Sequence, residues 1–183
     1  MAANCVNYNC DDLSPFLLND TCKKGYPGGA KDAIFFDCDA GITDYSDGNA
    51  ILAAIAAGTA LEVFNLKIRL NKGSAVTVES PVDCSPVQVV DYTRTGTIFD
   101  GNVNSTNDYA WETLLSGRTI GSMLFNNCGE GGTRSTLIDA EISFQGDKVF
   151  PGESEFQRYE IDFNWKGLDT MAKTIPTPNG VFV

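Results

Sequence analysis

The chain of 183 residues carries 24 acidic and 13 basic side chains, a net charge of −11, and no histidine. This charge speaks against a protein that grips nucleic acid or an anionic membrane, because both functions need basic surface. The missing histidine excludes Ser-His-Asp and Cys-His catalysis and every His-ligated metal site. With 43% apolar residues, we expect one domain with its own core and terminal arms.

The first ten residues lack the basic and apolar regions of a signal peptide. The most apolar stretch, residues 51–60, is far shorter than the roughly 20 residues that cross a bilayer. We therefore expect synthesis in the cytoplasm and no contact with a membrane.

The six cysteines could be free thiols or form disulfides, and the sequence leaves both states open. They include no Cys-x-x-Cys pair, so the sequence indicates no metal site. Four of the six lie within the first 38 residues, where disulfides would form if the protein meets an oxidising exterior; a cytoplasmic product keeps free thiols. Six cysteines admit 15 pairings, and the sequence does not choose among them.

Three regions follow from the pattern of turns and periodicity. Residues 1–31 are rich in turn-forming residues with one small apolar cluster at residues 16–18, which predicts an extended N-terminal arm. Residues 32–167 are expected to form a β-rich core domain. Residues 168–183 contain two prolines and end in three apolar residues. This pattern predicts a C-terminal tail.

The core begins with a strand at residues 33–36 and a short helix at 47–57. Ser46 or Asp47 is expected to cap this helix and Gly58 to end it. A strand is predicted at residues 61–70, with Leu66, Ile68 and Leu70 pointing inward because apolar and basic residues alternate there.

Further strands are predicted at residues 74–79 and 87–95, separated by a proline-bounded loop. Residues 97–99 are expected to pair back across Gly96 as a hairpin. A second helix is predicted at residues 106–116, with a cap between Ser105 and Asp108 and a stop at Gly117. Residues 118–127 again have the character of a strand.

Two strands near the C-terminus have the clearest period of two. One face of residues 136–144 and one face of residues 155–165 are apolar, and their other faces are polar. The apolar faces are formed by Ile138, Ala140, Ile142 and Phe144, and by Tyr159, Ile161, Phe163 and Trp165.

No constellation in the sequence carries chemistry, so we expect neither an enzyme nor a cofactor or resident metal. The acidic residues between Asp37 and Asp47 lack EF-hand spacing, and the glycine-rich run at 129–132 has no Lys-Ser/Thr pair after it. Glu160 and Asp162 lie on the polar face of a regular strand, where charges keep a chain soluble. Arms with apolar ends gain stability by docking on another subunit, which favours a self-assembling structural protein.

The order of elements resembles the tail tube (major tail) proteins of long-tailed phages. The resemblance spans roughly residues 60–167 and is carried by the helix at 107–116, the strand through Phe125, and the closing unit of residues 138–144 and 152–163. It implies a mainly β fold, a β-sandwich or barrel-like antiparallel core with one or two short flanking helices. It also implies hexameric rings stacked around an electronegative lumen through which DNA passes without binding.

The resemblance implies a virion location, with the chain itself and other virion proteins as partners. Four carboxylates are then expected to face the lumen: Glu79, Asp83, Asp91 and Asp100. Eight residues are expected at contacts between subunits: Phe16, Leu17, Tyr26, Val82, Pro86, Phe150, Pro176 and Phe182.

Two alternatives stay open at this level. One is another phage structural role, an auxiliary capsid protein or a head–tail connector component. The other is a monomeric β-sandwich that binds Ca²⁺ through the acidic residues between Asp37 and Asp47 and a glycan through aromatic side chains.

Overall fold

Six antiparallel strands close into a barrel in the computed structural model of the chain, which describes residues 30–78, 88–116, 120–127, 133–150, 157–167 and 169–182. Around the barrel the order is β1 (Ala30–Asp37), β3 (Leu66–Leu70), β5 (Gln88–Asp100), β8 (Arg158–Lys166), β7 (Arg134–Val149) and β6 (Ile120–Asn127). Pairing of β6 with β1 closes the circle. The predicted mainly β fold is confirmed.

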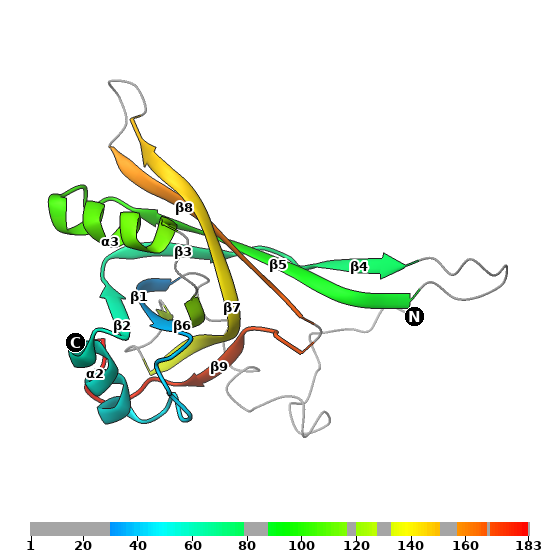
Figure 1. Cartoon of the computed structure of the whole chain (residues 1–183), viewed down its shortest axis with the longest axis horizontal. Coiled ribbons are helices and arrows are strands. Elements are labelled where there is room, and N and C mark those ends of the chain that lie inside the picture. The colour runs from blue at the N-terminus through cyan, green and yellow to red at the C-terminus, as the bar shows by residue number, and fades with distance from the viewer. Residues whose placement is uncertain are drawn as a thin grey trace, which may run out of the picture.

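Three more strands extend this barrel at its edges. β2 (Ala60–Val63) pairs with β1, β4 (Ser74–Val78) with β5, and β9 (Lys173–Pro176) with β7. Figure 1 shows the β4–β5 hairpin and the outer part of the β7–β8 hairpin projecting from the barrel in different directions. No helix in the described part of the chain is long and apolar enough to span a bilayer.

The barrel interior is filled by the apolar faces predicted from the period of two. Ile138 and Ile142 from β7 meet Ile161, Phe163 and Trp165 from β8 there. The pairing of β7 with β8 is antiparallel, with Phe144 opposite Phe163. The helix α3 (Ser105–Leu115) contributes Trp111 and Leu114 to the same core.

A second core lies outside the barrel, between β1 and α2 (Gly48–Ala57). Ile34 and Phe36 of β1 point into it, whereas Ala33 and Phe35 point into the barrel. Because the middle of β1 is buried on both faces, its residues 33–36 are a continuous apolar run without alternation. Ile51 and Ala54 of α2 complete the packing on the helix side.

The predicted N-terminal cap is confirmed for α2 and is wrong for α3. Asp47 caps α2 by accepting bonds from the amides of Asn49 and Ala50, and Gly58 ends it with a φ of 74°. In α3 the cap is Asn104, one residue before the predicted range. Asn104 accepts from the amides of Thr106 and Asn107, and asparagine is as strong a cap as serine or aspartate.

Three predictions for the middle of the chain are wrong. The strand at 61–70 is interrupted at Asn65, whose φ of 59° turns the chain between β2 and β3. Leu70 is exposed, because β3 ends where the barrel does. Gly96 makes no turn: β5 is continuous, and a Cβ there would lie 2.2 Å from the Phe163 ring. Here glycine provides room for an aromatic side chain.

The C-terminal segment belongs to the fold of its own subunit. β9 lies along β7, and Val181 is buried in the second core beside α2. Gly48 allows this close approach, since a Cβ on it would lie 2.0 Å from the carbonyl oxygen of Asn179. The described part of the predicted tail is therefore packed against the barrel domain and α2.

Candidate assembly surfaces

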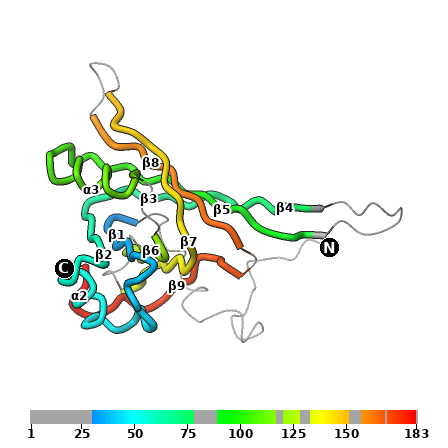
Figure 2. The backbone as a smooth tube through the Cα atoms, viewed as in Figure 1, coloured from blue at the N-terminus to red at the C-terminus, as the bar shows by residue number. Residues whose placement is uncertain are grey.

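The β4–β5 hairpin extends beyond the strands that support β5. β8 pairs with β5 only from Asp100 to Thr93, so residues 88–92 are left with β4 as their strand partner. We call this two-stranded extension, residues 74–78 and 88–92, the ribbon; Figure 2 shows it leaving the barrel. An isolated two-stranded ribbon is marginally stable in water, so a surface that covers it would stabilise it.

Exposed valines lie on the ribbon. Val76, Val89 and Val90 are 41%, 43% and 46% exposed. Val76 pairs with Asp91 and Thr77 with Val89, so Val90 is the extra residue of a β-bulge. A bulge redirects side chains and bends the strand, and this bulge keeps two adjacent valines outside the core. Valine at these positions loses contact with water only if another surface packs on the ribbon.

The edges of the ribbon are open among the described residues. β4 pairs with β5 alone, and β5 before Tyr92 has no strand on the side where β8 lies further along. Open edges present unpaired amide and carbonyl groups that another chain can bind as an added strand. The ribbon combines open edges and exposed valines on one projecting element.

The outward face of β3, β5, β8 and β7 is the second candidate surface, and we call it the polar face. Its acidic side chains are exposed or half-buried: Glu141, Asp147, Glu160 and Asp162. Thr97 donates to Asp162 at 2.8 Å across the β5–β8 pair, and Arg158 pairs with Glu160 at 2.6 Å. Arg69 lies over the Phe99 ring, with its guanidinium carbon 5.9 Å from the ring centre. The face is therefore hydrophilic with an acidic β7–β8 half.

Of the four carboxylates predicted to face a lumen, the structure describes two. Asp91 is half-buried on the ribbon, where its Oδ1 lies 2.7 Å from the amide of Tyr92. Asp100 is fully buried, so the prediction that it faces a lumen is wrong. Glu79 and Asp83 lie outside the described residues.

Asp100 instead joins the end of β5 to α3. Its carboxylate accepts from the amide of Asn102 at 2.8 Å, from Asn107 Nδ2 at 2.7 Å and from Trp111 Nε1 at 2.8 Å. Three donors compensate for the water that a buried carboxylate loses. From the sequence, Asp100 could be recognised only as an acidic residue at the end of a strand. Its hydrogen-bond donors lie in the loop and the helix that follow that strand.

Three of the predicted subunit contacts fall within the described part of the chain. Phe150 is 65% exposed at the end of β7, and Pro176 is exposed on β9. Phe182 is half-buried and packs against the second core of its own subunit. Phe16, Leu17, Tyr26, Val82 and Pro86 lie outside the described residues.

The acidic residues between Asp37 and Asp47 serve local turns. Asp44 accepts from the amide and hydroxyl of Ser46, and the hydroxyl bond is the main cause that lowers the pKa of Asp44. Asp47 caps α2. In the described segments, no three His, Cys, Asp or Glu side chains gather closely enough to hold a metal ion.

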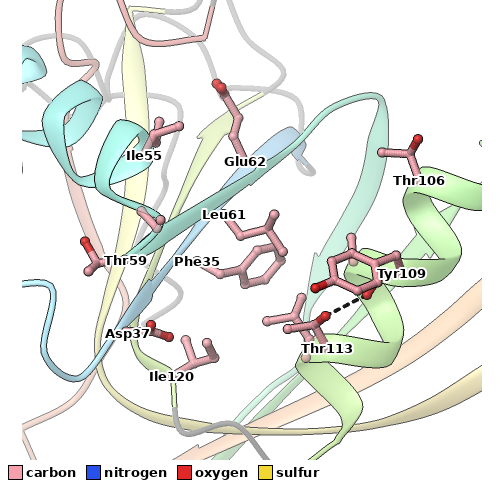
Figure 3. A pocket seen from close by; sticks show the side chains of 14 residues that line it. Phe35, Asp37, Ile55, Thr59, Leu61, Glu62, Thr106, Tyr109, Thr113 and Ile120 are labelled. Carbon is pink, nitrogen blue, oxygen red and sulfur yellow. Dashed lines mark hydrogen bonds between the residues drawn. The ribbon is translucent and has the colours of Figure 1, made fainter.

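A cleft of about 500 Å³ separates β2 from α3 (Figure 3). Phe35, Leu61, Leu114 and Ile120 contribute apolar side chains to it, and Tyr109 of α3 stands at its side, 73% exposed. Its charged lining residues, Asp37 and Glu62, are both acidic. Burial, and then the charge of Asp32, raises the pKa of the Glu62 carboxyl.

Asp108 marks the other side of α3. It accepts from Lys148 Nζ at 2.9 Å and from the Tyr159 hydroxyl. These two bonds, that of Tyr159 first, hold the pKa of Asp108 below its usual value. They tie α3 to the β7–β8 hairpin.

The resemblance implied that residues 74–79 and 87–99 supply ring-forming strands and lumen hairpins, but sequence reasoning identified neither the exposed valines of the ribbon nor the polar face as a surface. The valines were visible in two strand patterns, but nothing in their spacing shows where the supporting strand β8 ends. The acids of the polar face were recognised only as the solvent side of regular strands.

No protein-family model matches the chain, and no curated protein does. Among solved structures, mutants of the Hcp1 protein from the E. coli EAEC 042 pathovar align with a TM-score of 0.30 and 10% identity, covering 80% of this chain and 99% of theirs. A TM-score of 0.30 does not establish a shared fold.

Proposed function

We propose that the chain is a non-enzymatic virion subunit that assembles with copies of itself into hexameric rings, stacked as the tail tube of a phage. The observation that carries this proposal is the ribbon, a projecting hairpin with exposed valines and open edges. A surface of this kind on one end of a subunit makes a head-to-tail contact, and head-to-tail contacts close into rings or extend into filaments.

The polar face is the surface that suits the lumen of such a ring. Glu141, Asp147 and Asp162 repel the phosphate backbone, so DNA would pass along this face as cargo without being held. The functional carboxylates are then those on β7 and β8, together with Asp91 on the ribbon. The excess negative charge of the chain supports this role and does not require a bound cofactor.

Electron microscopy of the purified protein over a range of concentrations tests the proposal. We expect rings with sixfold symmetry, or stacked rings, and light scattering that rises with concentration. Rings or lattices with threefold or quasi-equivalent contacts would favour an auxiliary capsid or connector role. A strict monomer at every concentration, and also after seeding with preformed tail assemblies, would contradict a tube subunit.

A further inference from the structure

The cleft between β2 and α3 leaves apolar surface uncovered beside a free backbone edge. β2 pairs with β1 and, among the described strands, with no other. Leu61 of β2 is half-buried and points into the cleft, the buried Phe35 of β1 lines it from the barrel side, and the exposed Tyr109 of α3 lies across from them (Figure 3). A volume of about 500 Å³ lies in the range of sites that bury a ligand or several side chains. An extended apolar segment fits this combination, because it can add a strand to β2 while its side chains enter the cleft.

The chain itself contains a segment with matching chemistry. Twenty-nine residues precede Ala30, and their apolar cluster is Phe16, Leu17 and Leu18. Lys23 and Lys24 follow this cluster closely. Glu62 lies on β2 beside the cleft, with its side chain on the face of the strand opposite to that of Leu61 (Figure 3). It is half-buried near Asp32, and an ammonium group from a strand added along β2 would stabilise its charge there.

The length of chain between the two sites is sufficient. β1 runs eight residues from Ala30 to Asp37, about 26 Å at the usual rise per residue, and the cleft lies near its Asp37 end. The eleven residues between Leu18 and Ala30 span up to about 40 Å when extended. Because residues 16–18 are covalently attached to the barrel, their effective concentration at the cleft is high. The same segment of a second copy competes only when the protein concentration exceeds this value.

We propose that residues 16–18 of the same chain dock in the cleft along the β2 edge, with Lys23 and Lys24 close to Glu62. Phe16 and Leu17 then cover their own subunit and do not contact a neighbour. Docking covers both the apolar cleft and the open edge of β2, and leaves the ribbon free for assembly. The proposal is independent of the tube function, because it concerns one chain.

Photo-cross-linking tests this docking directly. The full chain carries p-benzoylphenylalanine in place of Tyr109, and samples labelled with ¹⁴N and ¹⁵N are mixed before irradiation and trypsin digestion. We expect a cross-link to the tryptic peptide of residues 1–23, within chains of one isotope. The same label in place of Phe150, an equally exposed aromatic position at the end of β7, should not reach this peptide.

Mixed-isotope cross-links would overturn the proposal in favour of docking on a second copy. Cross-links from position 109 to other peptides alone would overturn it as well. Neither result bears on tube formation, which the microscopy measures separately.

Charge variants test the role assigned to Glu62. Glu62→Lys should lower the yield of the cross-link about fivefold, and Lys23→Glu with Lys24→Glu in the same chain should restore it. In that chain the yield is measured on the tryptic peptide of residues 1–31, because the two earlier cleavage sites are lost. Glu141→Lys, an equal change of charge on the polar face, is the matched control and should leave the yield unchanged. An equal cross-link yield with Glu or Lys at position 62 overturns the proposed pairing. A second variant tests the apolar cluster: Phe16→Ser with Leu18→Ser should abolish the cross-link while the melting temperature of the barrel stays the same.

Discussion

Single residues in this protein take roles that their neighbours in space decide. Asp100 was expected to face a lumen and is instead buried beneath α3, where a loop amide, an asparagine side chain and the Trp111 indole donate to it. Asp47 and Asn104 cap helices, and Gly96 leaves room for the Phe163 ring. Each role depends on a donor or a side chain that lies elsewhere in the fold.

Asp100→Ala should therefore destabilise the subunit. The change leaves three donors without their acceptor, which costs about 3 kcal/mol and lowers Tm by roughly 6–12 °C in a chain of this size. Thermal melting followed by circular dichroism measures the shift. Asp91→Ala is the matched control, because Asp91 is half-buried and its Oδ1 accepts from the adjacent amide, so the Tm of this variant should move little. Equal Tm values for the two variants would show that the Asp100 network contributes no stability.

Elements begin and end where local bonds and supporting strands permit. α2 lies between Asp47 and Gly58, both of which were recognisable in the sequence. α3 begins after Asn104, which lies just beyond the residues considered as caps, because several polar residues there compete for the same position. β5 continues through Gly96 because β8 pairs with it from Thr93 to Asp100 and β3 pairs with its other edge from Gly96 to Asp100.

Asn104→Ala is expected to lower the free energy of unfolding by about 1 kcal/mol, because the amides of Thr106 and Asn107 lose their acceptor. Urea denaturation measures this value. Ser105→Ala removes the neighbouring cap candidate of the sequence and should change the free energy by no more than about 0.3 kcal/mol. If Ser105→Ala were the more damaging variant, the helix would begin one residue later in solution.

The whole molecule is a closed barrel with a ribbon projecting from it, two helices, and a polar face. The side chains that fill the barrel are buried by other residues of the same chain. The ribbon is different, since its valines and edges are uncovered. The surface proposed for assembly is thus separate from the core that stabilises the fold, so we expect variants that affect one without the other.

Val89→Asp with Val90→Asp should block assembly while leaving the melting of the subunit nearly unchanged. Charges on the ribbon oppose its burial against another subunit, but the two valines already face water in the subunit itself. Light scattering and electron microscopy measure assembly, and thermal melting measures the subunit. Phe150→Asp is the control at an exposed apolar residue outside the ribbon. Loss of assembly in the control alone would place the contact at the β7–β8 hairpin.

Local sequence patterns were enough to predict the β class, both helices, the cap and stop of α2, and the inward faces of β7 and β8. These features depend on a period of two, on turn residues and on caps, all of which act over a few neighbouring residues. Tertiary structure alone decided that the strands close into a barrel, that β1 serves two cores, that Val181 packs beside α2 and that Asp100 is buried. It also decided which strands project without support, because the exposure of the ribbon valines depends on where β8, a strand distant in the sequence, stops pairing with β5.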